Sequence, residues 1–168
     1  GRSPLNWALI TGKLSFSTNL FKYEDNVDAG NVVDSISFTI EESDHIVDLH
    51  LKNVNAMVVL VCKNYKKMVT NTIKFIPQDK NKATYYPRRE AGDGYIDWNL
   101  NSNHIFNFIR ALSRPFPGAF SYLNEQKFNI WNSEKISSTN NISMAPGQIV
   151  SIETDSIIVS CKKSVLRI

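Results

Sequence analysis

The sequence contains few cysteines and no long hydrophobic run, and these two absences exclude several classes of protein. Its two cysteines, Cys62 and Cys161, lie far apart and outside any Cys-x-x-Cys or Cys/His spacing, so neither a zinc site nor a disulfide framework is indicated. The longest apolar run, AMVVLVC at 56–62, is far shorter than the roughly 20 residues of a membrane-spanning helix. We therefore predict two small buried thiols, no insertion into a membrane, and a cytoplasmic location.

A strong excess of one sign of charge is missing as well. The 19 Lys and Arg residues and the 16 acidic residues give a net charge of +3, and the lysines are scattered along the sequence. Such a surface gives little reason to expect a nucleic-acid partner. With 168 residues, 42% of them hydrophobic, the chain has the composition of a soluble globular protein with one sizeable core or two small ones.

The first half of the sequence predicts two strands around a turn, followed by a long helix. Residues 14–23 mix β-branched, aromatic and small polar side chains, and apolar residues alternate with polar ones over 36–40. The acidic segment 41–44 is typical of a helix start. After it, apolar residues recur in steps of four and three, which predicts an amphipathic helix whose apolar stripe covers a sheet. That stripe consists of Val47, Leu51, Val54, Val58, Val61, Tyr65 and Met68.

The second half of the sequence predicts shorter elements. Residues 71–82 are polar and contain Pro77, which indicates a linker. Beyond this linker we predict a strand near 83–86, a helix over about 102–112, a hairpin at 119–123 and 127–131, a polar loop at 137–143, and strands at 148–152, 156–160 and 165–168. The predicted fold class is therefore α/β, with an α/β half-domain at 1–82 and a small, mainly β subdomain at 83–168.

Three segments carry the most distinctive residues. They are GRSPLNWALI at 1–10, EDNVDAGNVV at 24–33 and TYYPRREAGDGYIDWNLNSNHIFNFIRALSRPFPGAF at 84–120. Together with the tail PGQIVSIETDSIIVSCKKSVLRI, they resemble in order and spacing the formyltransferases that use 10-formyltetrahydrofolate, above all the sugar-nucleotide N-formyltransferases. The sequence is also similar to methionyl-tRNA formyltransferase and to the formyltransferase domain of the aminoarabinose lipid A modification enzyme.

This resemblance implies a fold, a co-substrate and a substrate. It implies the C-terminal half of a Rossmann-like formyltransferase domain, followed by an OB-like subdomain. It implies formyl transfer from 10-formyltetrahydrofolate, without a metal, to a nucleotide-linked amino sugar of bacterial surface polysaccharide such as lipopolysaccharide. The family's Asn-x-His motif would lie before Gly1, so we expect the natural protein to extend further at its N-terminus and the 168-residue chain alone to be inactive.

The resemblance assigns the catalytic carboxylate to Asp28. In the family this aspartate orients a histidine and stabilises its charged form, and Val27, Asp28 and Ala29 would approach the pterin of the folate. Taken alone, Asp-Ala-Gly is also a common turn between two strands. The flanking matches favour the catalytic interpretation.

Four further residues are candidates for substrate binding. Arg88 and Arg89 would hold a pyrophosphate bidentately, the alternative being a surface ion pair with a neighbouring acid. Trp98 is either a platform for the base or a core anchor. Arg110 would reach the phosphates or pair with Asp97.

Two other functions stay open at this point, and so does the oligomeric state. One is methionyl-tRNA formyltransferase, although the modest charge gives tRNA binding little support. The other is a non-catalytic nucleotide-binding piece without the Asn-x-His motif. A homodimer is one possible state of assembly.

Overall fold

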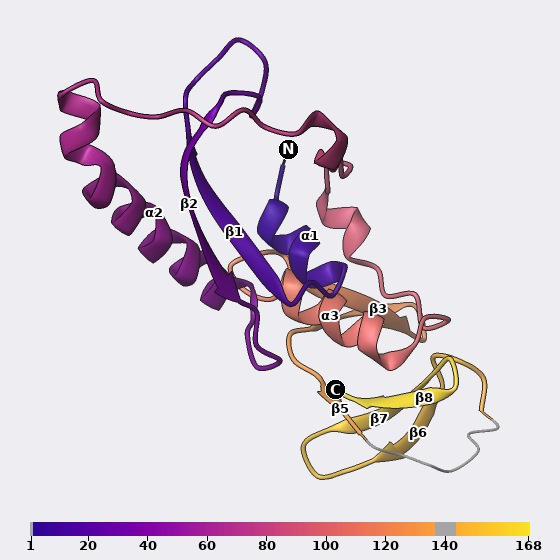
Figure 1. Ribbon diagram of the computed structural model, residues 1–168. Coiled ribbons are helices and arrows are strands. Elements are labelled where there is room, and N and C mark those ends of the chain that lie inside the picture. The colour runs from indigo at the N-terminus through magenta and orange to yellow at the C-terminus, as the bar shows by residue number, and fades with distance from the viewer. Residues whose placement is uncertain (1, 137–143) are drawn as a thin grey trace.

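The computed structural model describes residues 2–136 and 144–168, and the polar loop predicted at 137–143 lies outside the described residues. The described chain contains three α-helices, two 3-10 helices and eight strands (Figure 1). In chain order they are α1 (Pro4–Ile10), β1 (Ser15–Phe21), β2 (Val32–Thr39), α2 (Ile46–Val69), η1 (Lys80–Lys82), η2 (Ala91–Gly94), α3 (Ser102–Leu112), β3 (Ala119–Leu123), β4 (Gln126–Ile130), β5 (Glu134–Lys135), β6 (Ile149–Ile152), β7 (Ile157–Cys161) and β8 (Ser164–Arg167).

The first half is built on an antiparallel hairpin of β1 and β2, with α2 running alongside it (Figure 1). Both strands and the helix are as the sequence predicts. The inward face of α2 is not the predicted one. It carries Ile46, Leu49, Ala56, Leu60 and the polar Asn64. The predicted apolar stripe is instead mainly exposed, so the prediction that this stripe covers a sheet within the chain is wrong.

Polar contacts explain why α2 uses its less apolar face against the hairpin. The hydroxyl of Thr18 on β1 donates to Asn53 Oδ1 at 2.6 Å, and Asn64 Nδ2 donates to Asp34 Oδ2 on β2 at 2.9 Å. Lys63 forms an ion pair with the same Asp34 carboxylate at 2.8 Å. Hydrogen bonds from Asn64, Lys63 and the backbone together lower the pKa of Asp34 to about 2.

Two clusters of buried side chains form the core. One joins α1, the end of β2, the start of α2 and α3, and consists of Leu5, Ala8, Leu9, Ile40, Ile46, Leu49 and Ala111. The other lies within the second half and consists of Ile96, Ile105, Ile109, Leu112, Ala119, Ile130, Cys161 and Leu166. Helix α3 contributes to both clusters. The division at 82 and 83 into two domains remains a prediction.

The second half contains a two-stranded hairpin of β3 and β4 and a four-stranded antiparallel sheet of order β5-β8-β7-β6. The hairpin turn at Asn124 and Glu125 has positive φ at both residues, the conformation that suits a two-residue hairpin loop. The strand predicted near 83–86 is wrong, because this segment has no regular secondary structure. The structure therefore shows a mixed α/β fold, while the Rossmann-like and OB-like assignments remain predictions.

The two cysteines differ in their surroundings. Cys161 is buried as predicted, and burial raises the pKa of its thiol to about 11. Cys62 is exposed on α2, so the prediction of a buried thiol is wrong there. Among the residues that the structure describes, no helix is both long enough and apolar enough to span a membrane.

Arg110 ties the second half of the chain to the first. Its Nη1 donates to the carbonyl oxygens of Glu41 at 2.7 Å, Glu42 at 3.2 Å and Asp44 at 2.9 Å, which lie just before α2. Its Nε donates to Asn107 Oδ1 at 2.9 Å, and only 6% of the residue is exposed. Burial lowers the pKa of Arg110, and the nearby Asp44 and Glu42 oppose that effect.

We predict that Arg110→Met lowers the free energy of unfolding by about 2–4 kcal/mol, because the substitution leaves one buried and two part-buried carbonyl oxygens without their charged donor. Urea unfolding followed by circular dichroism measures this change. Arg114→Met is the matched control, since Arg114 is exposed and its guanidinium lies 5.2 Å from the centre of the Trp131 ring. That contact is worth only about 0.5–1 kcal/mol. Equal losses in the two variants would contradict the role given to Arg110.

Candidate functional site

The Asp28 turn joins β1 to β2 and is closed by a hydrogen bond from the Lys22 N–H to the Asn31 carbonyl at 2.9 Å. Asp28 is exposed and has a φ of 54°. Gly30 is required for space, because a Cβ atom at this position would lie 1.6 Å from the Lys22 carbonyl oxygen. The sequence Asp-Ala-Gly therefore produces a compact loop that presents its aspartate at the tip of a hairpin.

Gln78 holds this turn from a distant part of the chain. Its Nε2 donates to the carbonyl oxygens of Asp28 at 2.8 Å and Gly30 at 2.6 Å. Two residues earlier, Ile76 and Val32 exchange backbone hydrogen bonds at 2.8 Å in each direction. The segment predicted as a linker is thus attached to the loop that carries the candidate carboxylate. Sequence analysis missed Gln78, because one glutamine in a polar segment gives no local signal.

Arg89 lies between two aromatic rings from different helices. Its guanidinium carbon is 5.5 Å from the centre of the Trp7 ring on α1 and 5.1 Å from that of Phe108 on α3. One Nη donates to the Asp93 carbonyl at 2.6 Å, while the buried Nε has no hydrogen-bond partner among the described residues. Burial lowers the pKa of Arg89. This arginine therefore connects α1, α3 and the segment that leads into η2.

The neighbouring aromatic residues fix the segment before Arg89 against α1. Tyr86 stacks on Trp7 with ring centres 5.0 Å apart and an angle of 17° between the ring planes. Trp7 Nε1 donates to the Pro87 carbonyl at 3.1 Å. Arg88 is exposed and takes part in no hydrogen bond or ion pair within the described residues. The two arginines thus have different surroundings, with Arg89 packed and Arg88 facing solvent.

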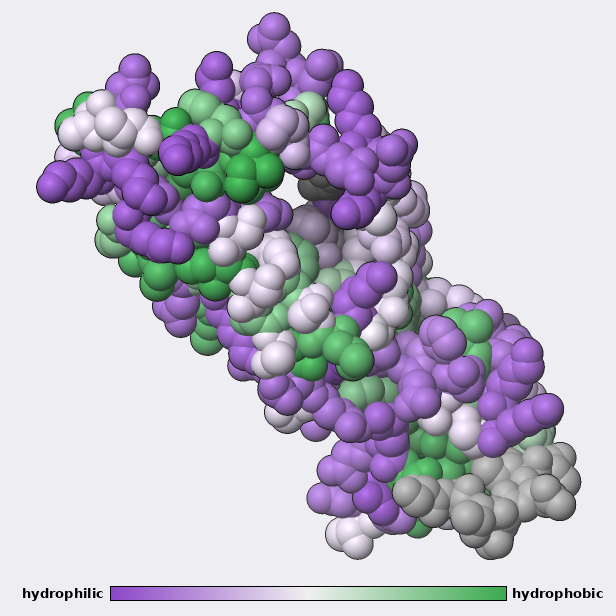
Figure 2. Space-filling view, viewed as in Figure 1, coloured by the Kyte–Doolittle hydropathy of each residue, from purple (hydrophilic) through white to green (hydrophobic). Residues whose placement is uncertain are grey.

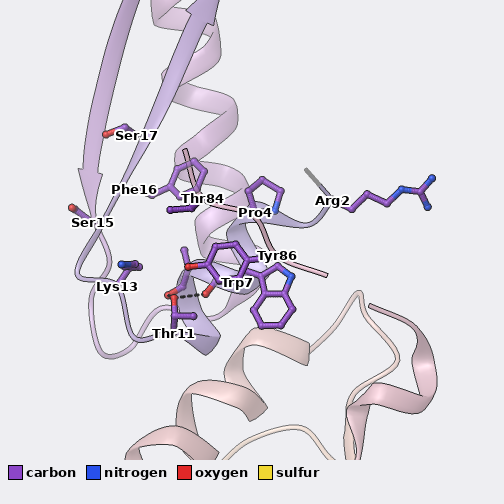
Figure 3. Close-up of a pocket in the computed structure, with 11 residues that line it drawn as sticks. Arg2, Pro4, Trp7, Thr11, Lys13, Ser15, Phe16, Ser17, Thr84 and Tyr86 are labelled. Carbon is purple, nitrogen blue, oxygen red and sulfur yellow. Dashed lines mark hydrogen bonds between the residues drawn. The ribbon is translucent and has the colours of Figure 1, made fainter. Parts of the chain in front are cut away.

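A pocket of about 280 Å³ lies where the segment that contains Thr84 and Tyr86 meets α1 and the start of β1 (Figure 3). Tyr86 and Trp7 stand side by side at its centre in Figure 3, with Lys13 and Ser15 on one side. Its lining is a mixture of aromatic, hydroxyl and basic side chains: Arg2, Pro4, Trp7, Ala8, Thr11, Lys13, Ser15, Phe16, Ser17, Thr84 and Tyr86. Such a lining suits a polar ring compound or a phosphate ester. Asp28 and the four predicted substrate residues are not among those that line it.

Trp98 is partly buried in the second half, and Arg110 is buried where α3 meets the segment before α2. Trp98 packs against the core cluster there, and its Nε1 donates to Ser121 Oγ at 3.0 Å. Arg110 binds the carbonyls before α2, whereas Asp97 Oδ1 accepts from the N–H and side-chain amide of Asn99. The predicted ion pair of Arg110 with Asp97 is therefore wrong. The core-anchor alternative describes the surroundings of Trp98.

The remaining candidates, Val27 and Ala29, lie in the same turn as Asp28. Val27 is 84% exposed, and Ala29 N–H donates to the Asn26 carbonyl at 3.3 Å within the same turn. Over the described residues, no group of three or more His, Cys, Asp and Glu side chains is arranged to hold a metal ion. Asp28 therefore lies in an exposed loop, and Arg88 lies in an exposed segment two residues after Tyr86, which lines the pocket.

Comparison with known proteins identifies relatives of the chain. Residues 89–168 match the family model described as formyl transferase, C-terminal domain. The chain is 38% identical over all 168 residues to the bifunctional polymyxin resistance protein ArnA of Wigglesworthia glossinidia brevipalpis, and it spans 25% of that protein's length.

Two solved structures show a similar fold. HypX from Aquifex aeolicus in complex with tetrahydrofolic acid superposes with a TM-score of 0.75 at 16% identity, covering 99% of this chain and 29% of HypX. WlaRD, a sugar 3N-formyl transferase solved with dTDP and 5-N-formyl-THF, gives a TM-score of 0.74 at 18% identity, covering 98% of this chain and 58% of WlaRD. These identities are low, so the two structures support the fold alone.

We predict that Gln78→Leu loosens the Asp28 turn without unfolding the hairpin. The substitution removes both hydrogen bonds from the Gln78 amide, so amide hydrogen exchange over 26–31 should become at least about tenfold faster while β1 and β2 keep their protection. Gln126→Leu, a substitution at an exposed position on β4, is the control. Unchanged exchange in the turn of the Gln78 variant would remove Gln78 from its positioning role.

Proposed function

Residues 89–168 match the formyl transferase C-terminal domain family, and from this premise we propose that the chain is part of a sugar-nucleotide N-formyltransferase. The proposed enzyme moves a formyl group from 10-formyltetrahydrofolate to the amino group of a nucleotide-linked sugar. The observation that carries this proposal is the identity of 38% to ArnA along the whole chain. The fold shared with WlaRD, a sugar 3N-formyl transferase, supports it.

The chemistry assigns a proton-handling role to the Asp28 turn. Formyl transfer needs a neutral amine nucleophile, a donor that stabilises the tetrahedral oxyanion, and a group that moves the proton from the attacking to the leaving nitrogen. The Asp28 carboxylate orients a histidine and stabilises its charged form. Gln78 fixes the backbone of that turn through the Asp28 and Gly30 carbonyls. The chain itself supplies this carboxylate, and the rest of the enzyme supplies the histidine.

The arginine pair supplies the contact to the diphosphate, with the two residues in different roles. Arg88 is exposed and lies two residues after Tyr86, which lines the pocket, and in this proposal its guanidinium binds a phosphate bidentately. Arg89 has its faces covered by Trp7 and Phe108, and it positions the segment rather than donating all of its N–H groups to a ligand. Trp98 and Arg110 are not part of this proposed contact, because both have structural partners.

A panel of acceptors tests the proposed substrate class. The complete protein is incubated with 10-formyltetrahydrofolate and either UDP- or dTDP-linked amino sugars or charged initiator tRNA, and the products are analysed by mass spectrometry. We expect a formyl group on an amino sugar nucleotide and none on the tRNA. Formylation of the tRNA would favour methionyl-tRNA formyltransferase, and nucleotide binding without any formylation would favour a non-catalytic binding protein.

We predict that Asp28→Asn in the complete enzyme lowers kcat by about 10²–10⁴-fold, because it removes the carboxylate that orients the histidine and stabilises its charged form in the transition state. The Michaelis constants of both substrates should stay within about threefold of the wild-type values. Steady-state kinetics provides the measurement. Asp25→Asn, an exposed change in the same loop, is the matched control and should leave kcat unchanged. A near-normal kcat for the Asp28 variant would exclude that residue from the mechanism.

For the substrate contact, we predict that Arg88→Gln raises the Michaelis constant of the nucleotide sugar about tenfold with little change in kcat, the result of losing ground-state binding to a phosphate. The constant for the folate co-substrate should not change. Lys80→Gln, an exposed change in η1, controls for the loss of one positive charge on the surface. An unchanged constant in the Arg88 variant would return Arg88 to the class of solvated surface residues.

A further inference from the structure

The segment at 84–89 carries the arginine pair but has little structure of its own. It contains no helix or strand, and most of its residues are exposed, Tyr85 by 91%. Figure 2 shows hydrophilic surface, in purple, over the upper right of the molecule, where Figure 1 places the chain between α2 and α3. Burial in a core therefore does not hold this segment in place. A ligand contact made from it needs another anchor.

One side chain supplies most of that anchor. Over the described residues, the backbone of 84–89 takes part in one hydrogen bond, in which Trp7 Nε1 donates to the Pro87 carbonyl at 3.1 Å. The Trp7 ring also stacks on Tyr86, with ring centres 5.0 Å apart, and its centre lies 5.5 Å from the Arg89 guanidinium carbon. Figure 3 shows the Tyr86 and Trp7 rings side by side. The indole therefore contacts three of the four residues at 86–89, and the fourth is the exposed Arg88.

These contacts fix the backbone on both sides of Arg88. The ring of Pro87 limits its own φ and keeps the preceding Tyr86 extended. Because the peptide group is planar, the hydrogen bond to the Pro87 carbonyl also orients the peptide bond that joins Pro87 to Arg88. On the other side, the Arg89 guanidinium packs against the Trp7 ring. The Arg88 side chain thus starts from a fixed backbone position, although it is exposed.

Helix α1 gives Trp7 a rigid base. Leu5, Ala8 and Leu9 on the same helix are buried in the core cluster that α1 shares with α2 and α3. Asn6 Nδ2 donates at 2.7 Å to a backbone carbonyl of α3, which joins the two helices directly. A side chain on a packed helix holds its partners more precisely than one on a loop. The core therefore sets the position of the indole, and the indole sets the position of the segment.

We propose that Trp7 is a positioning residue for substrate binding, which holds the segment so that Arg88 meets the diphosphate of the nucleotide sugar. This inference rests on the proposed function, because it takes the phosphate contact of Arg88 as given. Only molecules with an ordered segment offer that contact, so loss of Trp7 lowers the apparent affinity in proportion to the molecules that lose the order. The effect of losing Trp7 therefore cannot exceed the effect of losing Arg88 itself.

Binding of UDP and dTDP to the complete protein, measured by isothermal titration calorimetry, tests this inference. We expect at least one of the two nucleotides to bind the wild type, and Arg88→Gln to weaken that binding about tenfold. Trp7→Leu, which removes both the stacking ring and the N–H donor, should weaken it about fivefold. Trp7→Phe, which keeps a ring but loses the donor, should weaken it about twofold.

The matched control is Trp131→Leu, which should leave nucleotide binding unchanged. Trp131 is also partly buried, and the guanidinium carbon of Arg114 lies 5.2 Å from the centre of its ring. Circular dichroism verifies that each variant keeps its secondary structure. If Trp7→Leu does not fold, Trp7→Phe decides the question, since it removes only the hydrogen bond to Pro87 and part of the ring surface.

A double variant separates positioning from a general loss of structure. If Trp7 acts through Arg88, the protein with both Trp7→Leu and Arg88→Gln should bind the nucleotide like Arg88→Gln alone, whereas independent effects would multiply to about fiftyfold. In the Trp7→Leu enzyme, kcat and the Michaelis constant of the folate should stay within about twofold of the wild-type values, because the positioned contact belongs to ground-state binding of the nucleotide.

The outcomes distinguish this inference from the proposed function. If Arg88→Gln weakens binding but neither Trp7 variant does, or if the effects of Trp7→Leu and Arg88→Gln multiply, the positioning role of Trp7 is overturned and the phosphate contact stands. If neither nucleotide binds, or if Arg88→Gln binds like the wild type, the phosphate contact itself is wrong and the role of Trp7 is overturned with it.

Discussion

The buried guanidinium of Arg110 is the constraint on which the arrangement of the chain depends. A charged group with 6% exposure needs hydrogen-bond partners, and the carbonyls of Glu41, Glu42 and Asp44 supply them. Those carbonyls precede α2, while Arg110 belongs to α3. The position of α2 relative to the second half of the chain is therefore set by a small number of directional contacts. Asn6 attaches α1 to the same helix α3, because its Nδ2 donates to the Ala111 carbonyl at 2.7 Å.

Two further sets of contacts fix the positions of irregular segments at the surface. Gln78 attaches the segment after α2 to the Asp28 turn, and Arg89 attaches the segment before η2 to Trp7 and Phe108. In both cases a side chain from an irregular segment binds groups that the regular elements hold in place. An irregular segment can thus have a defined position without a strand or helix of its own. The proposed catalytic carboxylate and the proposed phosphate contact both depend on such segments.

The sequence predicts elements with strong local signals. Helix α3 has a side-chain cap at Asn101, an apolar period and two following prolines, and its observed bounds equal the predicted ones. The hairpin of β3 and β4 follows from alternating strands around a two-residue turn. The short helix α1 was missed, since seven residues with Pro4 at the start give little periodicity. The strand near 83–86 was predicted from composition alone, whereas Tyr86 is held there by stacking on Trp7.

The inward face of α2 and the role of Arg110 illustrate what the sequence could not reveal. Apolar periodicity identifies a face that is buried somewhere, but it does not identify the partner that buries it. Polar pairs such as Thr18 with Asn53 join residues 35 positions apart, and no local pattern indicates them. The candidate site also depends on contacts between residues that are distant in the sequence. The family resemblance supplied Asp28, while Gln78 became visible only through its contacts in the structure.

The central claim is that Asp28 belongs to the reaction centre of a formyl-transferring enzyme. The most direct test is a crystal structure of the complete enzyme with 5-formyltetrahydrofolate and a nucleotide-linked amino sugar bound. The account predicts that the Asp28 carboxylate lies within about 3 Å of a histidine that faces the formyl group. It also predicts the diphosphate beside Arg88. A structure in which the Asp28 side chain faces bulk solvent, with both ligands bound elsewhere, would contradict the account.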